Sequence, residues 1–374
     1  MKRIIQILLF LLVLCMLLGA FASCKSNNSP ISSDSTESTA IEKNTADAPA
    51  TEEQDQPVVD AEAKIIDIYL IAGQSNAVGH TSIASYESAY AFAPELESGF
   101  LNVLFSGIAR YNNTEKYYRW GKTKLGLGRP GGNFLGPEAG MAKVLAEYYN
   151  EETGNVAGII KFGSGGTNLL NVTSGSNQYG NWVSPSYAEA KNIPYDGDGI
   201  TGKLYRDFLT VVKSQLFLLE ATEFTDFRIK GLYWMQGEND RGNPEEYRIA
   251  FGYFVQDLRR DLANAVMKLT GDNDDRGVSE MPIFVGTISK TFGEATESVV
   301  AGNIKFIEMQ KTLPDLPGIG EIVIVDNSDY AINTLQGSTS VAVGTDRYHW
   351  NQSDHLAIGY NVGKSILTYY NFES

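Results

Sequence analysis

The sequence predicts an α/β fold built on one parallel β-sheet with helices on both faces. Short apolar runs rich in Ile, Val, Tyr and Phe alternate with longer segments of helical spacing, an order typical of doubly wound sheets. Most of these runs lack polar alternation, as expected for strands buried on both faces. Five of them, residues 65–72, 156–162, 229–235, 283–288 and 321–325, predict a five-stranded sheet.

Apolar residues at helical spacing predict the segments that cover this sheet. These segments are residues 137–149, 203–219, 244–268, 303–313 and 352–369. Pro244 suits a first helical turn, with Asn243 before it as the cap. Residues 80–133, 171–202 and 287–301 have the composition of loops. Because sites in such folds form at the carboxyl ends of the strands, we expect these loops to overhang the site.

Residues 1–63 are not expected to belong to the folded domain, which we place at residues 64–374. Residues 1–23 have a basic start, an apolar run and then small residues, which predicts a lipoprotein-type signal peptide. The residues before Cys24 resemble a bacterial lipobox, so we expect a lipidated Cys24 to anchor the protein to the cell envelope, outside the cytoplasm. Plain secretion is the alternative. Residues 24–63 are rich in Ser, Thr, Asn, Ala and Glu, which predicts a disordered tether.

Charge and cysteine content exclude several classes of function. The formal net charge is −15, which argues against nucleic acid as a partner because phosphate contacts need clustered Lys and Arg. The chain has two cysteines, Cys15 inside the predicted signal and Cys24. The predicted domain therefore has no thiol for a disulfide, a metal site or a nucleophile.

A serine at the end of the first apolar run is the candidate nucleophile. The run stops at Gly73-Gln74-Ser75-Asn76, which would deliver Ser75 to the rim of the sheet. A serine needs a base, and the chain offers three histidines. His349 follows Asp346 in an Asp-x-x-His pattern. The Asp346 carboxylate can accept the Nδ1 proton and leave Nε2 to face Ser75.

The other two histidines are expected to have different roles. His355 falls where the last predicted helix begins, so we expect it at the surface or in a cap. His80 follows Ser75 closely, and we expect a structural role for it, with substrate contact as the alternative. The Trp182 side chain could lie in the core or stack on a sugar, and the sequence favours neither. Tyr233 and Trp234 are expected in the core.

Two further strand ends offer groups that could stabilise an oxyanion. The second run is followed by Gly165 and Gly166, whose lack of side chains lets a backbone N–H approach a reacting carbon. The third run is followed by Gln236, whose amide would lie on the same rim. Ordinary turn chemistry after a strand is the alternative explanation of both.

Together these motifs resemble a known family. In chain order they are Gly73-Gln74-Ser75-Asn76, Gly165-Gly166-Thr167, Trp234-x-Gln236-Gly237-Glu238-x-Asp240 and Asp346-x-x-His349. Over residues 63–372 the chain is similar to the sialate O-acetylesterase and acetylxylan esterase group (carbohydrate esterase family 6) of the SGNH hydrolase superfamily. The resemblance implies a three-layer α/β/α, flavodoxin-like fold, no metal or other cofactor, and an acetylated carbohydrate as substrate.

The resemblance also implies a role for each motif residue. Ser75 would be the nucleophile, His349 the base and Asp346 the group that orients it. The oxyanion hole would consist of the Ser75 N–H, the N–H of Gly166 or Gly165, and the Gln236 side chain. Glu238 and Asn76 would support these groups without touching the substrate.

Two other functions remain open at this point. Gly73-Gln74-Ser75-Asn76-Ala77 is close to the nucleophile elbow of α/β-hydrolases, which would allow an esterase for non-carbohydrate esters. Against it, Ser75 ends the first strand, and Asp346 and His349 are close neighbours in sequence. The chain could instead be an inactive glycan-binding lipoprotein, but such a protein needs no base aligned to a serine.

Overall fold

The computed structural model describes residues 64–195, 199–293, 296–330, 332 and 346–372. The predicted signal peptide, the predicted lipid-bearing Cys24 and the predicted tether all lie outside the described residues. None of the helices in the described ranges is long and apolar enough to cross a membrane.

Within the described residues a seven-stranded sheet forms the centre of the domain, in the order β4-β3-β6-β1-β7-β8-β9. Its strands are β1 Ile65–Gly73, β3 Val103–Tyr111, β4 Thr114–Lys122, β6 Val156–Ser164, β7 Asp226–Met235, β8 Ile283–Gly286 and β9 Ile322–Val325. Neighbouring strands are parallel except for β3 and β4, which are antiparallel. Two short strands, β2 Thr81–Ser82 and β5 Phe134–Leu135, pair separately.

The predicted strand count was too low by two. The five predicted runs are β1, β6, β7, β8 and β9, whereas β3 and β4 lie inside residues 80–133, which the sequence predicted as a loop. The reason is the position of β4 at the edge of the sheet. The side chains of β4 are exposed or half-buried and mostly polar, so it lacks the continuous apolar pattern of a central strand. β3 is largely buried, but Ser106, Gly107 and Arg110 break its apolar run.

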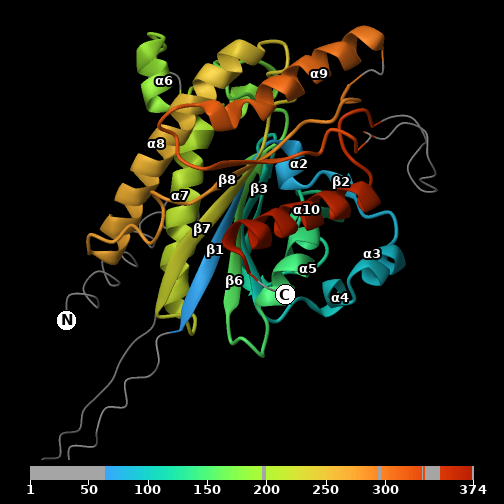
Figure 1. Ribbon diagram of the computed structural model, residues 1–374, viewed down its shortest axis with the longest axis vertical. Helices are drawn as coiled ribbons and strands as arrows, with labels where there is room; N and C mark the ends of the chain where they lie inside the picture. The colour runs from blue at the N-terminus through green and yellow to red at the C-terminus, as the bar shows by residue number, and fades with distance from the viewer. Residues whose placement is uncertain (1–63, 196–198, 294–295, 331, 333–345, 373–374) are drawn as a thin grey trace, which may run out of the picture. The chain divides into compact units, whose positions relative to one another are not determined.

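Helices cover both faces of this sheet, as predicted (Figure 1). α5 Glu138–Tyr148 and α10 Gln352–Tyr370 pack together on one side. α7 Lys203–Leu218 and α8 Pro244–Thr270 lie on the other side, and α9 Glu297–Lys311 packs beside α8. The shorter helices are α2 Ser75–Val78, α3 Tyr86–Phe92, α4 Glu95–Ser98, α6 Pro185–Ala190 and the 3-10 turns η2 Gly175–Tyr179, η3 Leu219–Ala221 and η4 Leu313–Asp315.

Pro244 occupies the first turn of α8 as predicted, but the Asn243 side chain makes no capping hydrogen bond. α9 begins at Glu297, earlier than the predicted residue 303, because its first turns face solvent and lack the apolar spacing.

Close contact between α5 and α10 fixes the carboxyl-terminal part of the chain. A Cβ on Gly140 would overlap Leu356 O, and one on Gly359 would overlap Pro137 O. The two backbones therefore meet directly, which only glycine permits at these positions. This contact holds the start of α10, and with it the segment before α10 that carries His349.

Candidate active site

The end of β1 places Ser75 at the carboxyl edge of the sheet. Gly73 has φ +139°, and a Cβ there would overlap Met235 O of β7. The β1 backbone can turn this close to β7 only with glycine. Gln74 N then donates to Met235 O at 3.0 Å, and α2 begins at Ser75. As the first helical residue, Ser75 has an N–H with no acceptor inside the helix.

His349 and Asp346 form a hydrogen-bonded pair, as the Asp-x-x-His spacing predicted. His349 Nδ1 lies 2.8 Å from Asp346 Oδ2. The other oxygen, Oδ1, accepts from Tyr348 N at 2.9 Å and His349 N at 3.1 Å. Burial by itself would raise the pKa of Asp346, but the hydrogen bond and charge of His349 and the two N–H groups lower it below its ordinary value. The carboxylate thus stays charged and orients the imidazole.

Several hydrogen bonds bring the His349 segment next to the Ser75 turn, although the two are far apart in sequence. Asn76 Nδ2 donates to Tyr348 O at 3.4 Å, and Thr81 Oγ1 donates to Trp350 O at 2.8 Å. Among the described residues Ser75 Oγ makes no hydrogen bond to His349. The Ser75 turn and the His349 segment are therefore neighbours, without a direct hydrogen bond between the two predicted catalytic side chains. Catalytic hydrogen bonds are often long or poorly aligned when no substrate is bound.

His355 is fully buried, so the prediction of a surface or capping role was wrong. Its Nε2 lies 3.1 Å from Asn76 O and its Nδ1 2.6 Å from Thr81 Oγ1. Burial, followed by the charge of Lys161, lowers the pKa of His355 to about 3. The neutral ring donates through Nε2 to Asn76 O and so supports the residue after the nucleophile. Its Nδ1 then accepts from the Thr81 hydroxyl, whose one hydrogen is shared between His355 Nδ1 and Trp350 O. The partners of His355 precede it by more than 270 positions, so no local pattern could reveal them.

The glycine pair after β6 lies beside the nucleophile. A Cβ on Gly165 would be 3.5 Å from the Ser75 Cβ. Gly166 has φ +72°, and its carbonyl oxygen accepts from Asn239 Nδ2. The Gly165–Gly166 turn is thus held against Ser75 by a side chain from the loop after β7.

Gln236 lies on the predicted rim, but both hydrogens of its amide are already in use. Gln236 Nε2 donates to Thr167 O at 3.1 Å and to Asp240 Oδ2 at 2.6 Å. Asp240 also accepts from Asn168 Nδ2 at 2.7 Å and Leu169 N at 2.8 Å. In this arrangement Gln236 joins the β6 and β7 loops. A direct bond from Gln236 to an oxyanion would require one of its two present bonds to open.

Glu238 and Asn76 are in contact behind the nucleophile. Asn76 Nδ2 donates to Glu238 Oε1 at 2.7 Å, and both side chains are buried. Burial raises the pKa of Glu238, and the bond from Asn76 opposes that rise. Since Asn76 also bonds Tyr348 O, this pair connects the nucleophile turn to the His349 segment.

A buried ion pair below the nucleophile turn was not predicted from the sequence. Lys161 Nζ lies 2.7 Å from Glu138 Oε2 and donates to Val78 O at 2.9 Å and Leu127 O at 2.8 Å. Both charged side chains are 1% exposed. The sequence did contain an indication of this pair. Lys161 lies inside an apolar run that is buried on both faces, and a lysine in such a strand must find a buried partner. Lys161 holds the end of α2, which begins at Ser75.

The aromatic residues considered as sugar contacts are in the core. Trp182 and Trp234 are fully buried with ring centroids 5.0 Å apart, and Tyr233 is 2% exposed. Trp182 Nε1 donates to Thr167 Oγ1 at 3.1 Å, so it supports the glycine turn and does not face solvent.

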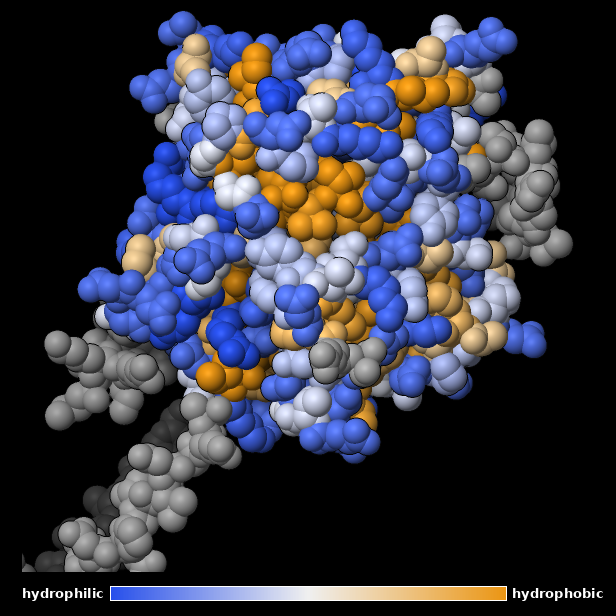
Figure 2. Space-filling view, in the orientation of Figure 1, coloured by the Kyte–Doolittle hydropathy of each residue, from blue (hydrophilic) through white to orange (hydrophobic). Residues whose placement is uncertain are grey.

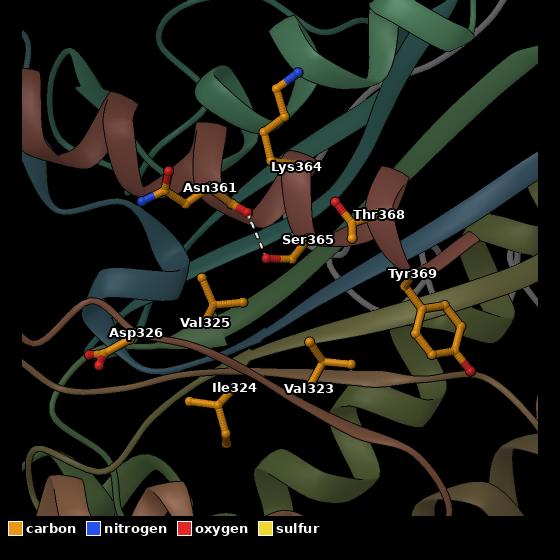
Figure 3. Close-up of a pocket in the computed structure, with 9 residues that line it drawn as sticks. All are labelled: Val323, Ile324, Val325, Asp326, Asn361, Lys364, Ser365, Thr368 and Tyr369. Carbon is orange, nitrogen blue, oxygen red and sulfur yellow. Dashed lines mark hydrogen bonds between the residues drawn. The ribbon is translucent and has the colours of Figure 1, made fainter. Parts of the chain in front are cut away.

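A hollow of about 440 Å³ lies between β9 and α10 (Figure 3). It is lined by Val323, Ile324, Val325, Asp326, Asn361, Lys364, Ser365, Thr368 and Tyr369. Figure 2 shows apolar surface gathered near the middle of the face drawn, within mainly polar surroundings. None of the residues with a predicted catalytic role lines this hollow.

In the part of the chain that the structure describes, no group of three or more His, Cys, Asp or Glu could hold a metal ion.

A family model described as carbohydrate esterase, sialic acid-specific acetylesterase, matches residues 65–314. The chain belongs to this family. The match covers Ser75, the glycine turn and the Gln236 motif, and it ends before Asp346. Membership in a family of carbohydrate esterases indicates an acetylesterase, and the predicted α/β fold is the one observed. No curated protein matches the chain.

Solved structures similar to this esterase share little sequence with it. NanS is 14% identical with a TM-score of 0.49, over 83% of this chain and 99% of that one. XAC1771, a carbohydrate acetylesterase from Xanthomonas citri, is 16% identical with a TM-score of 0.47, over 82% and 57%. A protein from Arabidopsis thaliana is 14% identical with a TM-score of 0.43, over 81% and 98%. The family assignment rests on the matched family model.

Proposed function

We propose that this protein is a carbohydrate O-acetylesterase that works through an acetyl-enzyme on Ser75. The observation that carries the proposal is the His349–Asp346 pair beside the Ser75 turn. An imidazole with its Nδ1 bound to a carboxylate has Nε2 available as a base. The proposed substrate is a sugar with an acetylated hydroxyl, of the sialic acid or xylan type.

The reaction follows from the placement of these groups. His349 Nε2 removes the Ser75 proton as Oγ attacks the acetyl carbonyl, and the carbonyl oxygen becomes an oxyanion. The tetrahedral intermediate then breaks its bond to the sugar oxygen, which takes the proton from His349. Water, deprotonated by His349, attacks the acetyl carbonyl of the acetyl-enzyme. The bond to Ser75 Oγ then breaks, Oγ takes the proton back from His349, and acetate and free Ser75 are released. Asp346 stabilises the imidazolium in both halves.

Backbone N–H groups are the best-placed oxyanion donors. Ser75 N–H is free of helical bonding, and the N–H of Gly166 or Gly165 belongs to the turn held against Ser75. One such donor contributes about 10²–10³ in kcat in other acyl transfer enzymes. Gln236 is a further proposed donor once one of its bonds to Thr167 O or Asp240 opens.

We also propose that lipidated Cys24 tethers the enzyme outside the cytoplasm.

Acetate release tests the proposal. Purified wild type, Ser75→Ala and, as a matched control, Ser82→Ala at an exposed position, are incubated with acetylated xylan, an O-acetylated sialic acid and an aryl acetate. Wild type and Ser82→Ala should release acetate, and Ser75→Ala should lose nearly all activity. Activity retained by Ser75→Ala contradicts the role of Ser75. No release by folded wild type on any substrate favours the glycan-binding alternative.

A further inference from the structure

His80 borders the proposed nucleophile and base, yet the reaction described above does not use it. Its ring centroid lies 4.9 Å from that of His349, with the planes inclined by 40°. On another side it makes a T-shaped contact with Tyr111, with ring centroids 5.1 Å apart. Only 7% of His80 is exposed. The imidazole is thus enclosed between the catalytic histidine and the end of β3.

One edge of the His80 ring faces the same small region as the Ser75 side chain. A Cβ placed on Gly165 would lie 2.7 Å from His80 Cε1, 3.0 Å from His80 Nε2 and 3.5 Å from Ser75 Cβ. The Cε1–Nε2 edge of His80 and the Ser75 side chain therefore both lie against Gly165.

His80 Nε2 is buried and has no hydrogen-bond partner within the described part of the chain. Burial, followed by the charges of His349 and Arg129, lowers the pKa of His80 to about 2, so the ring is neutral at any working pH. An unpaired buried nitrogen destabilises the protein, and a bound ligand can recover that loss by supplying the hydrogen-bond partner.

Tyr111 offers a surface for a ring beside this nitrogen. It ends β3 and is 40% exposed. The Arg129 guanidinium lies 4.8 Å from the centre of its ring and fixes its orientation. A part-exposed aromatic ring next to a single polar atom suits a sugar, which has apolar C–H groups and hydroxyls close together.

We propose that His80 is a substrate-binding residue whose Nε2 hydrogen-bonds a free hydroxyl of the acetylated sugar while Tyr111 contacts the sugar ring. This inference rests on the function proposed above. A hydroxyl both donates and accepts, so it pairs with Nε2 in either neutral tautomer, whereas a carboxylate or carbonyl pairs only with the Nε2–H form. A residue that merely fills space would need no polar atom here.

The test compares two substrates in each variant. An acetylated sugar has free hydroxyls beside the ester, and 4-nitrophenyl acetate has none. We expect His80→Leu to lower the ratio of kcat/KM for the sugar ester to kcat/KM for the aryl ester about ten- to hundredfold, because a site built around a hydroxyl loses its discrimination when the partner is removed. His80→Gln, which can place an amide near the position of Nε2, should restore part of that ratio.

Tyr111→Ala provides a second arm that does not depend on the folding of a His80 variant. We expect it to raise KM for the sugar ester more than for the aryl ester, whereas the control Tyr117→Ala, at a 68% exposed position on β4, should not. A ratio unchanged within about twofold in His80→Leu, or equal losses in His80→Leu and His80→Gln, would overturn the inference. If Ser75→Ala is inactive but the ratio does not move, only this inference fails. If wild type releases no acetate from the sugar, both it and the proposed function fail.

Discussion

Replacing Asp346 with asparagine tests the most specific part of the proposed site. The substitution removes the charge that faces His349 Nδ1 at 2.8 Å but retains an oxygen for the N–H groups of Tyr348 and His349. The turn should therefore persist. What is lost is the stabilisation of the imidazolium and the constraint on its tautomer.

The size of this loss can be worked from the pair. Two unit charges about 4 Å apart near a protein surface interact by about 4 kcal/mol. The side chains of His349 and Asp346 are 19% and 38% exposed, so solvent screens part of that interaction. We take about 2–3 kcal/mol, which at about 1.36 kcal/mol per factor of ten lowers kcat roughly 30- to 150-fold.

The assay is the kcat of acetate release, with Asp274→Asn as the control. Asp274 is a 66% exposed side chain that accepts from Arg276 N, a bond that asparagine can also make. Because the pKa of Asp346 is lowered, its carboxylate stays charged across neutral pH, so the titration of Asp346 itself adds no pH dependence to the effect there. A kcat within about threefold of wild type in a folded Asp346→Asn variant would refute the role of the pair.

Three more predictions concern groups around the site. Lys161→Met leaves the buried Glu138 carboxylate uncompensated and should cost about 3–5 kcal/mol in the free energy of unfolding measured with denaturant; an unchanged midpoint would contradict this. His355 has a folded-state pKa below its unfolded one, so the unfolded chain binds more protons below about pH 6.5. Stability should be complete above that pH and fall by up to about 1.4 kcal/mol per unit as pH drops towards 3, and His355→Gln should flatten the slope seen in unfolding curves. Gly165→Ala would push against His80, so it should reduce kcat/KM more in wild type than in a His80→Ala background; additive effects would show that the two residues do not touch.

Central strands were predictable because burial on both faces leaves a continuous apolar run. β1 is the clearest case, since all but its first residue are buried. The same rule missed β4, whose edge position leaves it exposed or half-buried. It also missed β3, which is largely buried but whose apolar run is broken by Ser106, Gly107 and Arg110. Sequence alone could place Ser75 at a strand end because a buried run followed by Gly73 and Gln74 has to stop at the rim.

The finer arrangement of the site depended on long-range partners. Asp346 and His349 were predictable since both lie in one short turn. The burial of His355 was not, because its partners Asn76 and Thr81 come from the other end of the domain. Likewise, the bonds of the Gln236 amide to Thr167 O and Asp240 appear only once the β6 and β7 loops are side by side.

Direct detection of the acetyl-enzyme tests the central claim. Wild-type enzyme is mixed with excess 4-nitrophenyl acetate, quenched with acid within the first turnovers, digested and mapped by mass spectrometry. We expect one acetyl group on the peptide that contains Ser75. The same peptide from Ser75→Ala should carry no acetyl group. Acetyl on another residue, or turnover in wild type with no acetylated Ser75 at any quench time, would contradict it.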